Sequence, residues 1–535
     1  MAQRILSRFK YTNLPPSEFE AIQVWEVGDE ARVKLSSVEA QISRQQGRPG
    51  SHWQPQIRAL QRDGASLRQT LDLCRSILSP IRLIPSEILT HIFAFTIPLI
   101  EDARKVDWDK SLEQTPWILG QISGHWRAVA LALPILWTSI IIRRTNDDSD
   151  PCSIPMLETQ LLRSRTSPLD VVFDIDGWGD QYVVQQALSA LVKCSSRWKS
   201  LYIAGEQLAR LPRIRGRVPI LEKLCVWGVP DPQDEDYGNS PPPDYMDHFE
   251  IAPRLRDLEV KECFPWFKVP WRQLARSRAG GHWDAHISAL VQLKNVESCR
   301  FMLGHECDIH DPFTWGSKTH EIPTLRQLML FCERRDSGEY WTCPPWLTLP
   351  GLTDLSIDAD MLRGLPRLLQ ASKFPLRRLH LTGSCPRDLD LVRPVFQSSP
   401  DLIELLINVI ERCWLPPCLA PLFSLLTLQP GKSALLPKLE HIIVVALPSH
   451  QDDVLGDMIV SRCSTTGGAS RLRSVTIHGE GLGANLASKL DGLRSHGLSV
   501  RAHRSRRESK LVERNYGESE DIFGYYSVQC EYYQF

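Results

Sequence analysis

The sequence predicts an α+β multidomain protein, in which N-terminal helices and a small all-α module precede an irregular α/β repeat solenoid. Three observations support this prediction. Apolar residues recur at helical spacing in the first quarter of the chain, a short phrase of proline and leucine recurs in the remainder, and a polar stretch rich in Asp and Asn separates the two patterns. We therefore expect a helical leader over residues 1–78, the module over 79–142, a linker over 143–160, the solenoid over 161–500 and a flexible charged and aromatic tail over 501–535.

The leader contains two helical patterns, over residues 18–46 and 54–78. Between them, residues 47–51 read Gly-Arg-Pro-Gly-Ser, and this combination of glycine and proline would interrupt a continuous helix. We therefore expect two amphipathic helices and not one long dimerising coiled coil.

The small module also carries two helical patterns, which lie within residues 83–137. In the first, Pro85 can serve as the first helical residue and Glu87 lies near the positive helix end. In the second, apolar residues recur from Trp117 to Leu133, and Pro134 ends the run. A domain of about 50 residues buries only about 60% of its unfolded surface. The apolar side chains of this module therefore need the rest of the chain or a partner.

The order of residues in the module resembles the F-box. The matching segments are Leu-Ile-Pro-Ser-Glu-Ile-Leu at 83–89, Ile-Ser-Gly-His-Trp-Arg at 122–127 and Pro-Ile-Leu-Trp at 134–137. Two departures are Ile84, where the family usually has Leu, and Ile-Ser at 122–123, where Val-Cys is common. The charged insert over 101–113 resembles the longer F-box-like variant that is abundant in mushroom-forming fungi. A generic helical hairpin core is the alternative interpretation of the same periodicity.

The resemblance implies that the module binds the Skp subunit of a Skp-cullin-F-box (SCF) ubiquitin ligase and, through it, the cullin. In this family the segment that follows the F-box holds a target protein. The residues that match the family's core and Skp-contact motif are Leu83, Pro85, Ile88, Leu89, Ile92, Ile122, Trp126, Leu136 and Trp137. The sequence does not divide these residues between core and contact surface.

A phrase of the form Pro-x-Leu-x-x-Leu-x-Leu recurs beyond the linker. It begins at Pro219, Pro253, Pro323, Pro350, Pro400 and Pro437, with Ile or Val allowed at the later positions. Degenerate copies are centred on Leu201, Cys299, Leu379 and Val475. The steps between central positions are irregular, from 23 residues (201 to 224) to 41 residues (258 to 299). This pattern predicts a divergent leucine-rich-repeat solenoid of short parallel strands, with an exposed loop over residues 231–247.

Residues that alternate with the core leucines would point to the other face of each strand. We expect a target protein to bind this face, because aromatic, Arg and Met side chains are enriched at interface cores. The candidate target-binding residues are Tyr202, Trp227, Glu259, Met329, Phe331, Arg378 and His380, and we expect His441 and His478 to be exposed on the same face. Coverage of several of them by loops is the alternative.

Composition and motifs exclude several classes of function. The formal net charge of −1 provides no global field to attract nucleic acid or an anionic membrane. We find no phosphate-binding loop, dinucleotide fingerprint, zinc-protease or hydrolase motif, so we expect no catalytic residues and no cofactor. The metal-capable residues at 305–311 lack a second ligand cluster, so a polar loop is favoured there. The basic cluster at 501–507 is interpreted as part of a solvated tail.

The sequence therefore predicts a non-catalytic substrate adaptor of an SCF ubiquitin ligase. The 14 scattered cysteines suit reduced thiols, and we see no secretory signal or membrane span, so a cytoplasmic or nuclear location is expected. The first alternative is a leucine-rich-repeat interaction scaffold without ligase association. The second is an enzyme whose active site is dispersed over the insertions.

Overall fold

The computed structural model describes two compact units. The first comprises residues 1–142 and 152–172, and the second comprises 143–151 and 173–535. Within them the described residues are 2–9, 14–46, 54–98, 115–143, 153–175, 181–227, 247–261, 268–281, 289–303, 319–332, 347–373, 375–383, 389–409, 419–429, 431–447, 452–464, 469–479 and 482–504. The chain mixes helix and strand and begins with helices, as expected.

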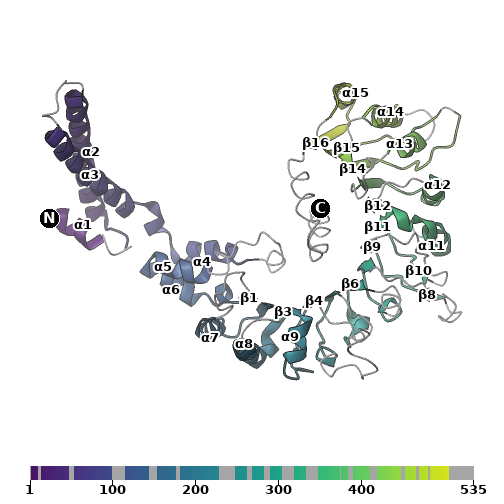
Figure 1. Cartoon of the computed structure of the whole chain (residues 1–535), viewed down its shortest axis with the longest axis horizontal. Helices are drawn as coiled ribbons and strands as arrows, with labels where there is room; N and C mark the ends of the chain where they lie inside the picture. Colours follow the sequence, from purple (N-terminus) through teal and green to yellow (C-terminus); the bar gives the residue numbers. More distant parts are fainter. Residues whose placement is uncertain are drawn as a thin grey trace. The chain divides into compact units, whose positions relative to one another are not determined.

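Three helices form the leader of the first unit (Figure 1): α1 (Ala2–Phe9), α2 (Glu18–Gln46) and α3 (Gln54–Ile77). Helices α2 and α3 pack antiparallel, because Gly28 of α2 lies against Cys74 near the end of α3, whereas Val38, later in α2, lies against Gly64 near the middle of α3. The boundaries of α2 and α3 confirm the two predicted helices. Helix α1 was not predicted from the sequence, and its Leu6 and Phe9 are buried in the core of the leader.

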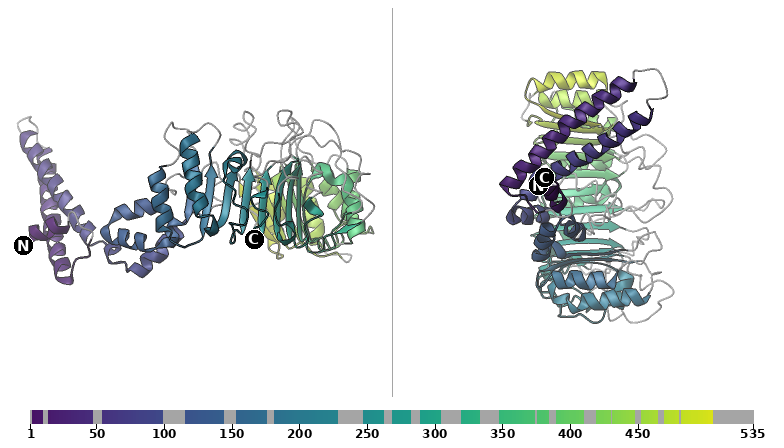
Figure 2. Two further views of the ribbon diagram at one scale, coloured as in Figure 1. Left: turned by 90° about the horizontal axis from the view of Figure 1, so that it is seen from below. Right: turned by 90° about the vertical axis from the view of Figure 1, so that its left-hand side faces the viewer.

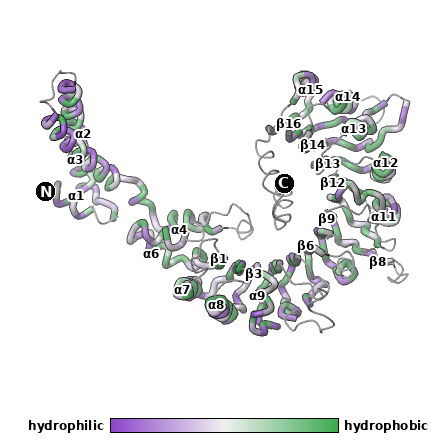
Figure 3. The backbone as a smooth tube through the Cα atoms, viewed as in Figure 1, coloured by the Kyte–Doolittle hydropathy of each residue, from purple (hydrophilic) through white to green (hydrophobic). Residues whose placement is uncertain are grey.

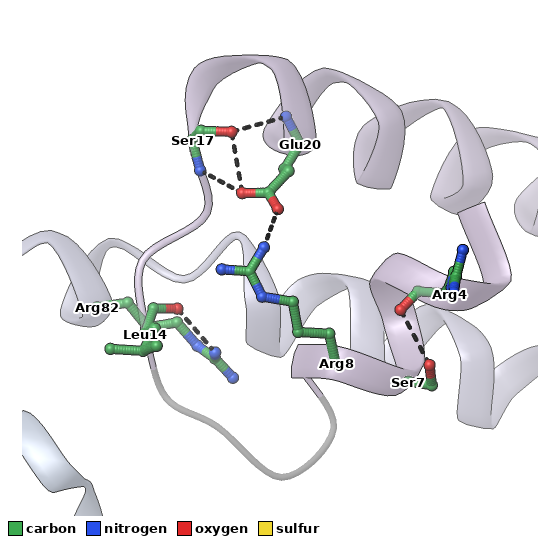
Figure 4. Close-up of polar contacts among 7 residues, drawn as sticks. All are labelled: Arg4, Ser7, Arg8, Leu14, Ser17, Glu20 and Arg82. Atoms are coloured by element: carbon green, nitrogen blue, oxygen red, sulfur yellow. Dashed lines mark hydrogen bonds and ion pairs between the residues drawn. The ribbon is translucent and has the colours of Figure 1, made fainter. Parts of the chain in front are cut away.

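Polar contacts fix the start of α2 (Figure 4). The Ser17 amide donates to the Glu20 carboxylate (2.9 Å), and the Glu20 amide donates to the Ser17 hydroxyl (3.3 Å), which is a capping box. Arg8 of α1 forms an ion pair with the same Glu20 carboxylate. The Arg82 guanidinium donates to the carbonyl oxygens of Leu14 (3.3 Å) and Ser76 (2.8 Å). The chain before α2 is thereby held against the segment after α3.

The small module consists of short helices: η2 (Pro80–Leu83), α4 (Ser86–Phe95), α5 (Thr115–Ile122), α6 (Gly124–Ala132) and η5 (Pro134–Trp137). The prediction of one helical run from Trp117 to Leu133 is wrong, since the run breaks at Ser123. This residue has extended backbone, and its hydroxyl accepts a hydrogen bond from the Trp126 amide (3.0 Å), so it is the N-cap of α6. Pro85 was expected to be the first helical residue, but it is the N-cap of α4, which begins one position later at Ser86.

Three further elements follow along the chain: β1 (Ser139–Arg143), α7 (Ile154–Arg163) and β2 (Leu169–Asp174). The prediction of a linker over residues 143–160 is wrong for its last part, because α7 begins at Ile154. Its Leu157 and Leu161 are buried, and the residues Ile-Pro at its start place proline where its missing amide hydrogen is tolerated. The first part of the predicted linker, over residues 144–152, lies outside the described residues.

The second unit contains a parallel sheet whose strands, stacked in Figure 2, follow each other in chain order. The strands of the sheet that lie wholly within this unit are β3 (Trp198–Ala204), β4 (Lys223–Trp227), β5 (Asp257–Lys261), β6 (Arg276–Gly281), β7 (Ser298–Leu303), β9 (Gln327–Cys332), β11 (Asp354–Asp358), β12 (Arg378–Gly383), β13 (Glu404–Val409), β14 (His441–Leu447), β15 (Ser474–Gly479) and β16 (Ser499–Arg504). A separate parallel pair is formed by β8 (His320–Glu321) and β10 (Leu347–Thr348).

The register of the sheet aligns the central residue of every predicted phrase. Leu201, Leu224 and Leu258 are successive Cα partners, and the same row continues through Leu328 to Val475. The predicted parallel strands are therefore confirmed. Strand β6 lies between the phrases centred on 258 and 299, and Ser277 takes the central position there. Strand β6 was not predicted because its sequence, Arg-Ser-Arg-Ala-Gly-Gly, contains no leucine.

The proline of the repeated phrase forms a tight turn before the strand. In five copies the amide of the first leucine donates to the carbonyl oxygen three residues earlier, as in Leu221 to Val218 (3.3 Å) and Leu402 to Ser399 (3.2 Å). Proline is then the second residue of a β-turn, where its fixed φ is favourable. The leucine that follows is buried in each copy.

Helices lie on the outer side of the curved sheet (Figure 1), and Figure 3 shows the hydropathy of both layers. The helical segments are α8 (Gln181–Lys193), η6 (Ser195–Arg197), α9 (Gly205–Arg210), η9 (Trp271–Gln273), η11 (Ala359–Gly364), α11 (Leu365–Ser372), α12 (Leu389–Gln397), α13 (Ala420–Leu426), α14 (Asp452–Cys463) and α15 (Ala484–Arg494). Each of α11 to α14 packs against the next helix. The predicted loop over 231–247 lies outside the described residues except at Asp247. The predicted flexible tail begins at residue 501, but the structure describes it only as far as Arg504, and residues 501–504 belong to strand β16.

Gly351 allows a close approach between two turns of the second unit. A Cβ atom at this position would lie 2.2 Å from the carbonyl oxygen of Pro323 and 3.2 Å from that of Leu325. Both contacts are to backbone, so a methyl group forces the turns apart. We expect Gly351→Ala to lower the free energy of unfolding by about 1–3 kcal/mol.

Urea unfolding followed by circular dichroism measures this effect. Gly492→Ala in α15 is the matched control, because its Cβ would meet nothing within 4 Å and alanine favours a helix. Equal unfolding midpoints for the Gly351→Ala variant and the wild type would show that the turns are not in close contact.

Asp452 is a buried carboxylate at the start of α14. One oxygen accepts a hydrogen bond from the Gly483 amide (2.5 Å), and the other has no hydrogen-bond partner among the described residues. Burial raises the pKa of this carboxyl, and the Gly483 hydrogen bond only partly opposes the shift.

The raised pKa predicts how stability depends on pH. The folded state binds a proton at Asp452 more readily than the unfolded state, so charge at this position destabilises the fold at neutral pH and the penalty disappears as pH falls through the folded pKa. We expect Asp452→Asn to be more stable than the wild type at pH 7 and the difference to shrink on acidification. Urea titrations at a series of pH values check this, and a difference that grows on acidification would contradict it.

Candidate docking site

The core of the small module is a compact apolar cluster. Leu89 and Phe93, one turn apart on α4, are fully buried, as are the side chains of Leu136 and Trp137 from η5. The remaining buried members of the cluster are Leu119, Val129 and Ala130. These residues hold the short helices together, since none of the helices is long enough to be stable alone.

Trp137 is the centre of this core. Its indole N–H donates to the carbonyl oxygen of Ala130 (2.8 Å), and its ring meets Trp117 edge to face at a centroid distance of 5.0 Å. The Arg163 guanidinium of α7 lies 4.4 Å from the centre of the Trp137 ring and 4.8 Å from that of Trp117. Helix α7 is thereby attached to the module.

Helix α4 has a second apolar ridge that faces solvent. Ile88 is 50% exposed, Ile92 is 41% exposed and Phe95 is 91% exposed, and these residues follow one another at helical spacing. Leu83, immediately before the helix, is 62% exposed. Since Leu89 and Phe93 occupy the buried side, α4 is apolar on both ridges, which is typical of a helix that is covered by a further partner. We call Leu83, Ile88, Ile92 and Phe95 the α4 face.

A small hollow lies at the junction of the leader and the module. Its volume is about 170 Å³, and it is lined by Ser76, Ser79, Ile81, Arg82, Ile122, Ser123, His125 and Trp126. Ile81 and Ile122 on its rim are 46% and 44% exposed. The Trp126 ring packs against Phe93 at a centroid distance of 5.1 Å, so it connects the hollow to the core of the module.

The structure divides the nine predicted Skp-binding residues into two groups. The buried group, with Trp126 partly buried at its edge, consists of Leu89, Leu136 and Trp137. The exposed group consists of Leu83, Pro85, Ile88, Ile92 and Ile122. Sequence reasoning missed Phe95, although it continues the spacing of Ile88 and Ile92 by a further turn.

The predicted exposure of the strand face is wrong for three candidate residues. Tyr202, Phe331 and Glu259 are 0%, 1% and 5% exposed. Neighbouring strands lie so close that side chains on one face cover each other. The Lys223 ammonium lies over the Tyr202 ring (5.3 Å), Arg300 lies over the Phe331 ring (5.3 Å), and Arg278 pairs with Glu259 (3.1 Å).

The other candidate residues of this face are more accessible. Arg378 is exposed, and Trp227, Met329, His380, His441 and His478 are half-buried. These residues lie on strands β4, β9, β12, β14 and β15, so they do not form one local cluster.

Asp354, Arg378 and Glu404 alternate in charge across the adjacent strands β11, β12 and β13. Arg378 pairs with Asp354, and the ring nitrogen Nε2 of His380 lies 3.4 Å from Glu404. The hydrogen bond with His380 lowers the pKa of the Glu404 carboxyl, although burial opposes the shift. A hollow of about 330 Å³ opens here, lined by Thr353, Asp354, Arg377, Arg378, Ile403, Glu404 and His441.

A row of polar contacts crosses three strands and joins Ser356, His380 and Glu404. In it, Ser356 Oγ lies 3.1 Å from His380 Nδ1. The residue types are those of a hydrolase triad, in which histidine activates the serine. Ser356 is only 7% exposed, however, and it does not line the hollow. We interpret this row of contacts as a cross-strand link that orients the Glu404 carboxylate.

Among the residues that the structure describes, no group of three or more His, Cys, Asp or Glu side chains could hold a metal ion. The metal-capable segment at 305–311 and the charged insert at 101–113 lie outside those residues. Among the described helices, no single one is long and apolar enough to cross a membrane. The segments Gln54–Leu83 and Ser86–Phe95, bent by 87°, meet that test only as a pair.

No protein-family model matches this chain. No curated protein matches it in sequence either.

Proposed function

We propose that this protein is the substrate-recognition adaptor of an SCF ubiquitin ligase. Its F-box-like module binds the Skp subunit, and the repeats of the second unit bind a target protein. Proximity to the ligase then raises the local concentration of the target. The protein itself performs no chemistry in this proposal.

The α4 face is the observation that supports Skp binding most directly. Leu83, Ile88 and Ile92 belong to the segment that resembles the F-box, and the structure leaves them exposed while Leu89 is in the core. Burial of a fully exposed side chain of this size contributes about 1.5–3 kcal/mol, and the exposed part of each of these side chains contributes in proportion to its area. An amphipathic helix that lays its apolar ridge into a groove is a common mode of recognition.

We propose further that the second unit is a divergent leucine-rich-repeat solenoid. Support comes from the row of leucines that are Cα partners in successive parallel strands, and from the helices on the outer side of the sheet. In such a stack each repeat buries its apolar residues against its neighbours. The target would bind the inner face, at the hollow beside Arg378 and Glu404.

The test is capture of a purified Skp subunit by the intact chain. Ile88→Asp combined with Ile92→Asp places two charges on the α4 face without touching the core, and we expect capture to fall by roughly tenfold or more. Leu162→Asp on α7 is the matched control, because Leu162 is 78% exposed and lies outside the module. A variant at Leu89 is unsuitable, since that side chain is fully buried.

Undiminished capture by the Ile88→Asp, Ile92→Asp variant would contradict the proposed docking face. Target binding without any Skp capture by the wild type would favour the alternative of an interaction scaffold without ligase association.

A further inference from the structure

Helix α2 of the leader is apolar on two opposite sides. On one side Val24 and Ala31 are buried, and Gly28 lies against Cys74 of α3. The opposite side carries a row of large apolar residues that are all more than half exposed: Phe19 (65%), Ile22 (58%), Trp25 (61%) and Val33 (65%). We call these four residues the α2 face.

The residues of the α2 face follow helical spacing and lie along one side of the helix. Four side chains of this size expose on the order of 400 Å², which is as large as the largest apolar patch on a typical monomer. Patches of this size mark interaction sites, and aromatic residues such as Trp25 and Phe19 are typical of the residues that dominate binding energy. A partner that covers this face is therefore expected.

The charges around the α2 face determine what kind of partner fits. The first four turns of the helix, residues 18–31, contain five acidic residues and no Lys or Arg. Glu20 pairs with Arg8, Asp29 with Arg32 and Glu30 with Lys34. Glu18 and Glu26 are exposed and have no ion-pair partner among the described residues.

Glu18 and Glu26 lie on the same side of α2 as the apolar row, since each is four residues, about one helical turn, from Ile22. A second copy of α2 laid parallel on this face would bring acidic residues of the two helices together, and like charges across an interface are unfavourable. A segment with apolar residues on one side and Lys or Arg at the edges satisfies both the apolar row and the carboxylates.

We propose that the α2 face docks a basic amphipathic helix of another protein. The rigid start of α2 supports this role, because the capping box at Ser17 and Glu20 and the ion pair with Arg8 hold the first turn in place (Figure 4). The docked helix packs along α2 on the side away from α3. This second docking surface does not depend on the adaptor proposal, because it lies on the leader and not on the F-box-like module.

The test uses two synthetic amphipathic helical peptides of equal length, one of leucine and lysine and one of leucine and glutamate. Each carries a fluorescent label, and its binding to the full-length protein is measured by anisotropy. We expect the leucine–lysine peptide to bind roughly tenfold tighter than the acidic peptide, and its affinity to fall as salt is added.

Two variants separate the apolar and the charged contributions. Trp25→Ser should weaken binding of the basic peptide by roughly tenfold or more. Reversal of charge with Glu18→Lys and Glu26→Lys should transfer the preference to the acidic peptide. The matched controls are Leu162→Ser and Glu158→Lys on α7, which make the same kinds of change at exposed positions elsewhere and should leave both affinities unchanged.

The positions chosen are exposed, so the helix content of each variant should equal that of the wild type by circular dichroism. Binding of the basic peptide that is insensitive to Trp25→Ser would overturn the proposal. Failure of the basic peptide to bind better than the acidic one would also overturn it. A dimer in sedimentation velocity that Trp25→Ser dissociates would instead assign the α2 face to a second copy of the chain.

Discussion

Replacement of Trp137 with alanine is expected to lower the free energy of unfolding of the first unit by about 3–5 kcal/mol. Trp137 is 1% exposed and fills the centre of the small module. The change leaves a cavity between η5 and α6, and the Ala130 carbonyl oxygen loses its indole donor. It also removes the ring against which Trp117 and Arg163 pack.

Thermal unfolding of the purified chain measures this loss. Ile135→Ala is the matched control, because Ile135 lies on the same short helix and is 49% exposed. We expect the control to change stability by less than about 1 kcal/mol, since a half-exposed side chain loses little burial. Equal effects of the two substitutions would contradict the assignment of Trp137 to the core.

Replacement of Arg462 with alanine is the second change with a large expected effect. Arg462 is 1% exposed, and its guanidinium donates to the carbonyl oxygens of Leu426 (2.8 Å), Leu435 (2.7 Å) and Leu436 (3.2 Å). Burial lowers the pKa of this group to about 10, so it is still protonated at neutral pH. The cation links α14 to the end of α13 and to the chain before β14.

Arg462→Ala leaves three carbonyl groups without their charged donor and opens a cavity behind α14. We expect the free energy of unfolding of the second unit to fall by about 3–5 kcal/mol. The control is Arg473→Ala, because the Arg473 side chain is 70% exposed and its ion pair with Glu440 contributes about 1 kcal/mol or less. Urea unfolding followed by circular dichroism distinguishes the two, and similar midpoints would show that Arg462 is not a structural cation.

The leader helices could be predicted because strong breakers delimit them. The boundaries of α2 and α3 lie within one residue of the predicted positions, and the Gly-Arg-Pro-Gly-Ser segment lies between the two helices. The break between α5 and α6 was missed, since Ser123 stands inside an uninterrupted apolar period and acts only through its side-chain cap.

The strands of the repeats could be predicted wherever proline occupies the turn before the strand and leucine occupies the core positions. Strand β6 could not, because Ser277 fills the core position and its neighbours are arginine, alanine and glycine. Only the pairing of β6 with β5 and β7 shows that a strand is present. A repeat with a polar core residue has no apolar period for the sequence to reveal.

The candidate docking site could be located from the sequence, but its buried residues could not be told apart from its exposed residues. On α4 the buried Leu89 and Phe93 and the exposed Ile88 and Ile92 have the same apolar character and the same spacing. Packing of α6 and η5 decides which ridge becomes the core, and that packing is not local in sequence. On the strand face, alternation predicts the direction of Tyr202 but not its coverage by the neighbouring strand.

Calorimetric titration of the intact purified chain with a purified Skp subunit is the most direct test of the proposed function. We expect saturable one-to-one binding with a negative heat-capacity change, because the apolar α4 face becomes buried. Binding should be lost in the Ile88→Asp, Ile92→Asp variant and kept in the Leu162→Asp control. Absence of binding by the folded wild-type chain would contradict the proposed function, and equal binding by the α4-face variant would contradict the proposed docking surface.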